Sequence, residues 1–216
     1  MREVSVVSVA EPQRRERKKR QTRDALVHAA LTLFNAKGYE HTTVREITDA
    51  VDVSERTFFR YFASKEDLAL SFIRDSNDSF VRELAARPAD EPPFTALANA
   101  FRASLRALTA ESGGSGDKQL YLLVVKLIDT TPSLLASLLR YMHDREQETV
   151  RLLAAREGVD PETDRRPRLA VAAYTALVVA ANREWRTGGD DSVEAMLAAF
   201  EANAEQLKPA LAGHWT

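Results

Sequence analysis

The sequence has no cysteine, few glycines and few prolines. Without cysteine the chain has neither a disulfide framework nor a thiolate metal site, and we expect it in a reducing compartment, the cytoplasm. Eight glycines and eight prolines in 216 residues leave long stretches free of helix breakers. Alanine, leucine, arginine and glutamate are plentiful instead, and these residues favour helices.

Long hydrophobic runs are also missing. The longest, Leu169–Ala181, is shorter than the ~20 apolar residues that cross a bilayer. Val4–Ala10 loosely resembles the core of a signal peptide, but it is brief and leads into a basic run. We therefore expect residues 1–19 to be a disordered basic leader and the chain to have no membrane partner.

The sequence lacks the motifs of catalytic and metal sites. It contains no Gly-rich phosphate loop, no nucleophile elbow and no His-Glu-x-x-His. The four histidines are scattered; His143 lies near Glu146, but a lone histidine among charged residues is more often a solvated side chain. We expect no enzyme activity, no cofactor and no metal.

Charge is distributed unevenly along the chain. The formal net charge is −2, yet Arg14–Arg23 holds seven basic residues and one acidic residue. Residues 1–67 carry a net charge of +2 and the remainder −4. A basic arm on a mildly acidic protein fits nucleic-acid binding, and a solvated tail fits the same run equally well.

Capping signals predict an all-α fold. Thr22 can cap a helix that Gly38 ends, Thr43-x-x-Glu46 is a capping box, and Ser54 caps a third short helix. Longer helices follow Ser64, and no strand-like alternation appears. The expected domains are a helix-turn-helix domain over residues 20–67 and a larger helical domain over residues 68–216, with a flexible loop at Glu111–Asp117.

The short helix after Ser54 has two different faces. Phe58 and Phe62 are one turn apart and can fill the core of a three-helix domain. The opposite side carries charge, rings and hydroxyls: Glu55, Arg56, Phe59 and Arg60, with Thr57 and Tyr61 at its edge. A generic solvated surface would explain any one of these residues, but together they fit the major groove of B-DNA.

Residues 20–72 resemble the N-terminal domain of TetR-family transcriptional regulators. The resemblance rests on Gly38-Tyr39, TTVREI, AVDVS, RTFFRYF and SKEDL, and Asp52 stands where the family usually has glycine. It implies that Thr43 and Arg45 face the DNA backbone and nearby bases, that Glu55 and Arg56 read bases, and that Lys65 clamps phosphate. It also places Thr57, Phe59, Arg60 and Tyr61 on the DNA-facing side.

The resemblance further implies a homodimer through the last two helices and a small-molecule ligand of unknown identity. A dimer would read a palindromic duplex, since one short helix reads only a few base pairs. Candidates for the ligand pocket mix purely apolar side chains with side chains that carry a polar group: Phe101, Leu105, Tyr121, Tyr141, Tyr174, Asn182 and Trp185. For each of them alone, simple core packing is the commoner role.

Three functions remain open at this point. The first is a repressor that binds a palindromic operator in double-stranded DNA and is released by a hydrophobic or amphipathic molecule. The second is a helical carrier or sensor of small molecules with a vestigial helix-turn-helix, which the exposed Arg45, Arg56, Arg60, Tyr61 and Lys65 disfavour. The third is a protein that coats DNA without sequence specificity.

Overall fold

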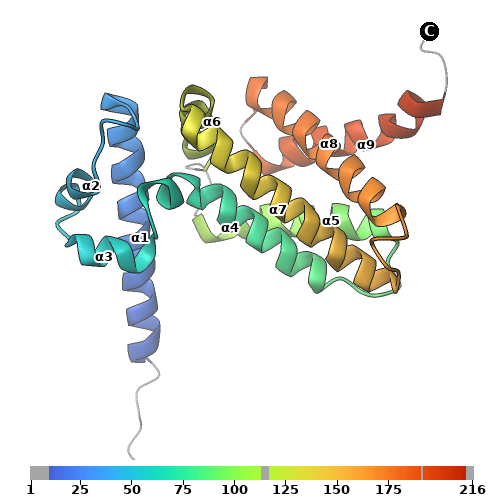
Figure 1. The fold of residues 1–216 in the computed structure, drawn as a ribbon, viewed down its shortest axis with the longest axis horizontal. Coiled ribbons are helices and arrows are strands. Elements are labelled where there is room, and N and C mark those ends of the chain that lie inside the picture. Colours follow the sequence, from blue (N-terminus) through green and yellow to red (C-terminus); the bar gives the residue numbers. More distant parts are fainter. Residues whose placement is uncertain (1–9, 113–116, 191, 213–216) are drawn as a thin grey trace, which may run out of the picture. The chain divides into compact units, whose positions relative to one another are not determined.

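The computed structural model describes residues 10–112, 117–190 and 192–212, and within these ranges it contains helices and no strand (Figure 1). This confirms the all-α prediction. The helices are α1 (Ala10–Lys37), α2 (Val44–Ala50), α3 (Glu55–Tyr61), α4 (Lys65–Ala85), α5 (Pro93–Ser112), α6 (Asp117–Thr130), α7 (Pro132–Glu157), α8 (Arg166–Thr187) and α9 (Val193–Ala212).

The chain divides into two compact units. Unit 1 comprises Met1–Ser71 with Lys126–Leu134, and unit 2 comprises Phe72–Val125 with Leu135–Thr216. The first break lies close to the domain boundary that the sequence predicts between residues 67 and 68. The inclusion of Lys126–Leu134 in unit 1 was not predicted, because it depends on contacts between segments far apart in the sequence.

Helix α1 begins earlier than the sequence predicts. Residues 10–19, expected to be part of a disordered leader, are helical, and residues 1–9 of that leader lie outside the described residues. Thr22, expected as the N-cap, is inside the helix, where its hydroxyl donates to the Lys18 carbonyl at 3.0 Å. Arginine, lysine and glutamine are good helix formers, and Pro12 stands in the first turn, where proline is tolerated.

The core of unit 1 is built by α1, α2 and α3. Leu26, Ala30 and Phe34 of α1 are buried together with Ile47 of α2 and Phe58 of α3. Gly38 ends α1 with a φ of +87°, the left-handed conformation expected after Lys37. Figure 1 shows α2 and α3 on one side of α1, whose N-terminal turns continue past α3.

The core of unit 2 includes a cluster of aromatic rings. Tyr174 of α8 stacks on Phe80 of α4 with ring centroids 5.0 Å apart, and Phe101 of α5 lies 5.0 Å from Phe200 of α9. Helices α5, α8 and α9 contact one another around these rings. Local caps lie at two helix ends of this unit: the Ser192 hydroxyl accepts from the Ala195 amide at 3.1 Å before α9, and Gly158 follows α7 with a φ of +66°.

Two further observations concern α5 to α7. Of the flexible loop predicted at Glu111–Asp117, residues 113–116 lie outside the described residues, while its first two residues belong to α5 and its last to α6. In the described ranges no single helix is long and apolar enough to cross a membrane. The consecutive segments Leu122–Thr130 and Pro132–Glu157 meet that criterion only as a bent pair, by length and composition.

Candidate nucleic-acid interface

Local hydrogen bonds fix α2 and α3 as a helix-turn-helix. The capping box of α2 is complete: the Thr43 amide donates to Glu46 Oε2 at 2.8 Å, and the Glu46 amide donates to Thr43 Oγ1 at 3.2 Å. Ser54 caps α3 by accepting from the Thr57 amide at 3.2 Å. Between the helices Asp52 has a φ of 53°, the left-handed conformation that aspartate tolerates better than most residues.

Helix α3 separates its aromatic residues as the sequence predicts. Phe58 is completely buried and Phe62 is 2% exposed, whereas the neighbouring Phe59 is 55% exposed. Phe58 holds the other two rings at centroid distances of 5.3 and 5.6 Å. The outward side has the predicted composition: Glu55, Arg56 and Arg60 are exposed, and Thr57 and Tyr61 are half-buried. One short helix therefore packs with one face and presents charge and hydroxyls with the other.

The cations of this surface differ in their partners. Arg60 donates to the Tyr61 hydroxyl at 3.2 Å, and its guanidinium carbon lies 4.9 Å from the Tyr61 ring centroid. Arg45 of α2 is one turn from Asp49 at 3.8 Å, and both side chains remain largely exposed, so this pair contributes little. Arg45, Arg56 and Arg60 thus present guanidinium groups to solvent from two neighbouring helices.

Lys65, which the resemblance implies as a phosphate clamp, also makes contacts within the protein. Its ammonium donates to the carbonyls of Tyr39 at 2.7 Å and Thr42 at 2.9 Å, and it lies 4.2 Å from the centre of the Tyr39 ring. Burial lowers the pKa of Lys65 and raises the pKa of Tyr39 to about 12. Lys65 therefore ties the start of α4 to the segment between α1 and α2, with one N–H left for another partner.

The carboxylate of Glu46 joins the cap of α2 to the end of α1. It accepts a hydrogen bond from Lys37 at the end of α1 and from the amide and hydroxyl of Thr43. The Lys37 hydrogen bond, followed by those from Thr43, lowers the pKa of Glu46 to about 2. The hydroxyl of Thr43, a predicted backbone contact, is therefore engaged within the protein. Thr43 itself is exposed beside Arg45.

The predicted pocket residues do not form one group. Phe101 and Tyr174 are buried in the unit 2 core, with Leu105 and Trp185 packed against it. The Trp185 indole donates to the Ser192 carbonyl at 3.0 Å, and Asn182 is half-buried. Tyr141 contacts another set of residues, with Arg74 and Arg145 5.2 and 5.5 Å from its ring centroid. The side chain of Tyr121 lies outside the described residues.

Burial is the main cause of the raised pKa of Tyr141 and Tyr174, the two predicted pocket tyrosines whose side chains the structure describes. It raises the pKa of the Tyr141 phenol to about 12 and raises that of Tyr174 further. Both phenols therefore stay neutral near pH 7 and can donate a hydrogen bond.

The sequence does not predict three sets of contacts in unit 1: Lys37 with Glu46, Lys65 with the Tyr39 and Thr42 carbonyls, and Arg23 over the Phe62 ring at 5.3 Å. The capping box signals a role for Glu46, but no local pattern identifies Lys37 as its partner. The other two contacts join residues more than twenty positions apart, and no sequence signal predicts them.

Comparison with known proteins matches both parts of the chain to family models. Residues 26–72 match the model described as "Bacterial regulatory proteins, tetR family", and residues 91–211 match the model described as "MftR C-terminal domain". The second match alone covers more than half of the chain. The first begins at Leu26 within α1 and contains α2 and α3, so it coincides with the surface described above.

Two relatives of this chain are described as HTH-type transcriptional regulators or repressors. The chain is 44% identical to the HTH-type transcriptional regulator TcmR of Streptomyces glaucescens over 204 residues, which cover 94% of this chain and 90% of that protein. It is 32% identical to the HTH-type transcriptional repressor KstR2 of Mycolicibacterium smegmatis over 87 residues, 40% of this chain and 42% of that protein.

Solved structures include a transcriptional regulator from Aquifex aeolicus VF5, 18% identical, covering 88% of this chain and 99% of that chain with a TM-score of 0.49. The assignment rests on the sequence matches, which extend over the helix-turn-helix and over almost the whole chain. This chain belongs to the TetR family, whose members are DNA-binding transcriptional regulators and not enzymes.

Proposed function

We propose that this protein is a ligand-responsive repressor that binds a palindromic operator as a homodimer. Residues 20–67 read the DNA, and residues 68–216 bind the ligand and form the dimer. One observation carries the proposal: α3 buries Phe58 and Phe62 and leaves Arg56, Arg60 and Tyr61 accessible. Because it acts on DNA, we also propose that it works in the cytoplasm.

Base reading is assigned to the first turn of α3. Arg56 is exposed there, and a guanidinium can donate two hydrogen bonds to O6 and N7 of one guanine. The adjacent Glu55 is also exposed and can accept from a cytosine amine. Phe59, on the same outward side, offers an apolar ring to a thymine methyl group. These side chains supply sequence specificity.

The remaining contacts position the helix on the backbone. Arg60 and the hydroxyls of Thr57 and Tyr61 lie along the outward side of α3 and suit phosphate oxygens. On α2, Thr43 and Arg45 suit the neighbouring phosphates in the same way. Lys65 adds its remaining N–H to this set while it continues to hold the carbonyls of Tyr39 and Thr42.

Dimerisation is assigned to α8 and α9. Along α8, Leu169 and Val179 are 67% and 61% exposed, and Ala172 and Ala176 between them are also exposed. Their spacing of three and four residues places these four side chains on one stripe of the helix. The small alanines allow another helix to approach closely. A two-fold partner helix that covers this stripe would remove large apolar side chains from water.

Ligand binding is assigned to the aromatic core of unit 2. Tyr174 combines a neutral phenol with rings of Phe80, Phe101 and Phe200 within 6.2 Å of its own. Such a set fits a hydrophobic or amphipathic molecule with one hydrogen-bonding group. Leu105, Trp185 and Asn182 border this region, and Tyr121 and Tyr141 remain candidates. Release follows if the ligand binds more tightly to a conformation that does not fit the operator.

The test is selection of bound duplexes from a random pool. We expect an enriched palindrome for the wild-type protein. Arg56→Ala should lose about 1–3 kcal/mol of discrimination, mainly at one base pair of each half-site. Arg151→Ala, which removes an exposed arginine of α7, is the matched control and should select the wild-type palindrome. A pool without any enriched sequence would contradict the proposal.

A further inference from the structure

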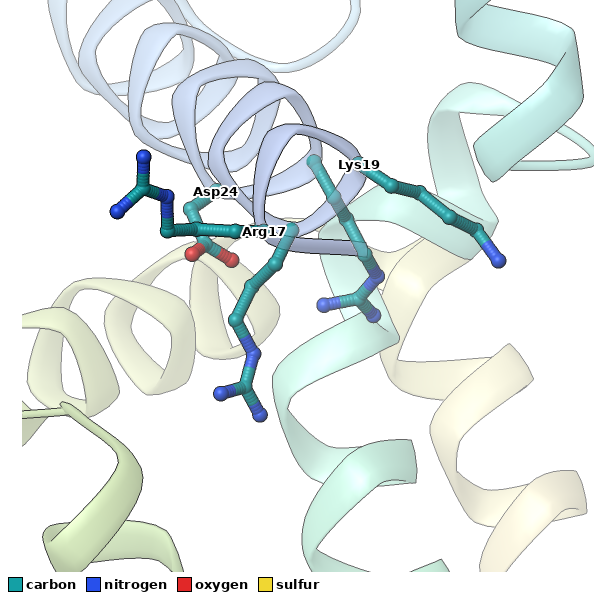
Figure 2. A pocket seen from close by; sticks show the side chains of 5 residues that line it. Arg17, Lys19 and Asp24 are labelled. Carbon is teal, nitrogen blue, oxygen red and sulfur yellow. The ribbon is translucent and has the colours of Figure 1, made fainter. Parts of the chain in front are cut away.

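The N-terminal turns of α1 carry a run of basic side chains, most of them exposed, that lies outside α2 and α3. We define the arm as residues 14–23. Arg14, Arg15 and residues 17–21 are all exposed, and the first buried side chain of α1 in the described part is Leu26. Figure 2 shows Arg17 and Lys19 extending to different sides of the helix; with Arg20, Arg23 and Asp24 they line one hollow.

The charges of the arm oppose the helix that carries them. Arg14 is one turn from Lys18 and Arg15 is one turn from Lys19, and like charges at this spacing destabilise a helix. Positive side chains near a helix N-terminus are also unfavourable to the macrodipole, which is positive at that end. A negatively charged partner placed along the arm would reduce both unfavourable interactions.

The composition of the arm selects the class of that partner. A membrane-surface helix needs an apolar face, and the exposed positions from Arg14 to Gln21 are all polar. A polyanion needs only closely spaced cations, because each lysine or arginine placed at a phosphate releases a condensed counterion. From Ala10 to Arg23 the helix extends over about 20 Å, enough to follow several phosphates of a duplex.

A contact within unit 1 places the base of the arm next to α3. The guanidinium carbon of Arg23 lies 5.3 Å from the centre of the Phe62 ring, and Phe62 is the C-cap residue of α3. A duplex held against the outward side of α3 is thus close to the point from which the arm extends. The arm lies beside the helix proposed to read bases and not on it, and its lysines and arginines suit the phosphate oxygens there.

We propose that the arm is a second DNA-binding element, which contacts the phosphate backbone beside the bases read by α3 and adds affinity without sequence preference. This inference rests on the proposed function for its partner, double-stranded DNA. It extends that function to basic residues that precede α2 and α3 and gives them a different contribution: α3 decides which sequence is bound, and the arm decides how tightly and how salt-dependently the protein binds.

The experiment compares two variants with the same change in charge. Arg14→Gln, Arg17→Gln, Lys18→Gln and Lys19→Gln together neutralise the arm, and glutamine is a good helix former. The matched control neutralises four exposed arginines elsewhere: Arg82→Gln, Arg140→Gln, Arg151→Gln and Arg165→Gln. Dissociation constants are measured by fluorescence anisotropy on the selected palindrome and on a scrambled duplex of equal length, between about 50 and 200 mM salt.

We expect the arm variant to bind both duplexes at least about tenfold more weakly at 100 mM salt. The slope of log K against log salt should become shallower by about 0.9 for each lost phosphate contact. The ratio of affinities for the two duplexes should stay at the wild-type value. A slope equal to that of the control variant would overturn the proposal, and so would a loss of the preference for the palindrome.

Hydrogen exchange gives a second, independent measurement. In the free protein, amides 14–23 of the arm variant should exchange more slowly than in the wild type, because the like-charge repulsion is removed. In the wild type, adding duplex should slow the same amides. Absence of this DNA-induced protection would contradict the arm proposal. Failure of the proposed function would look different: the wild-type protein itself would show no preference for any palindrome.

Discussion

The adjacent residues Phe58 and Phe59 give a direct test of the two-faced recognition helix. They are the same residue type on the same helix, yet the side chain of Phe58 is completely buried and that of Phe59 is 55% exposed. Replacing each in turn by alanine removes the same atoms from opposite faces. The structure predicts loss of folding in one variant and loss of DNA binding in the other.

The expected magnitudes follow from burial. Truncation of a buried phenylalanine costs about 3–5 kcal/mol, because transfer energy is lost and a cavity remains. A domain as small as unit 1 has a stability of about this size, so we expect its α1–α3 core to be largely unfolded in Phe58→Ala. Phe59 contributes mainly one edge-to-face contact with Phe58 at 5.3 Å, which supports a loss of about 1 kcal/mol.

The assay must report on unit 1 separately. Trp185 belongs to unit 2, so its fluorescence is a poor probe of the α1–α3 core. Hydrogen exchange of amides 26–62 measures opening of that core, and anisotropy with the selected duplex measures binding. Phe58→Ala should lose protection and binding together, while Phe59→Ala should keep protection and bind more weakly. Equal destabilisation by both variants would refute the assignment of the two faces.

Three further predictions concern the cap, the turn and the dimer. Glu46→Gln should lower the midpoint of urea unfolding near pH 7 relative to the wild type. The pKa of Glu46 is about 2 in the folded protein and 4.5 ordinarily, so the difference between the two midpoints should shrink as the pH falls from 4.5 to 2. A difference that stays constant over this pH range would contradict the role of the Glu46 carboxylate in the cap. Because φ of Asp52 is 53°, Asp52→Val should lower the free energy of unfolding in urea by about 1–2 kcal/mol and Asp52→Gly by about 0.5 kcal/mol or less. Similar losses in the two variants would argue against the left-handed turn. Val179→Glu should raise the dimer dissociation constant at least about tenfold by sedimentation, whereas Arg151→Glu should leave it unchanged.

The features predicted correctly from the sequence are those set by short spacings. Thr43 and Glu46 are three residues apart, and Phe58 and Phe62 are four apart, so the capping box and the buried face of α3 can be read directly. The left-handed turn at Asp52 is also a local feature, because left-handed φ is accessible to few residue types. Local chemistry decides each of these features.

The features that the sequence did not predict depend on distant partners or on competing tendencies. Lys65 looks like an exposed cation at a helix start, but its partners are carbonyls more than twenty residues away. The segment before Thr22 has the high charge typical of a disordered tail, but it also consists largely of residues with high helix propensity. In the structure its residues from Ala10 onward are helical. The chemical character of the pocket candidates does not specify their positions, and packing groups Phe101 with Tyr174 but places Tyr141 beside Arg74.

Protection of guanine N7 from methylation tests the central claim most directly, because N7 lies in the major groove. With the selected palindrome, wild-type protein should protect a guanine N7 in each half-site, and Arg56→Ala should lose that protection at concentrations that still saturate the duplex. Arg151→Ala should retain it. Unprotected guanines under the wild-type protein, or full protection under Arg56→Ala, would show that the outward face of α3 does not read the major groove.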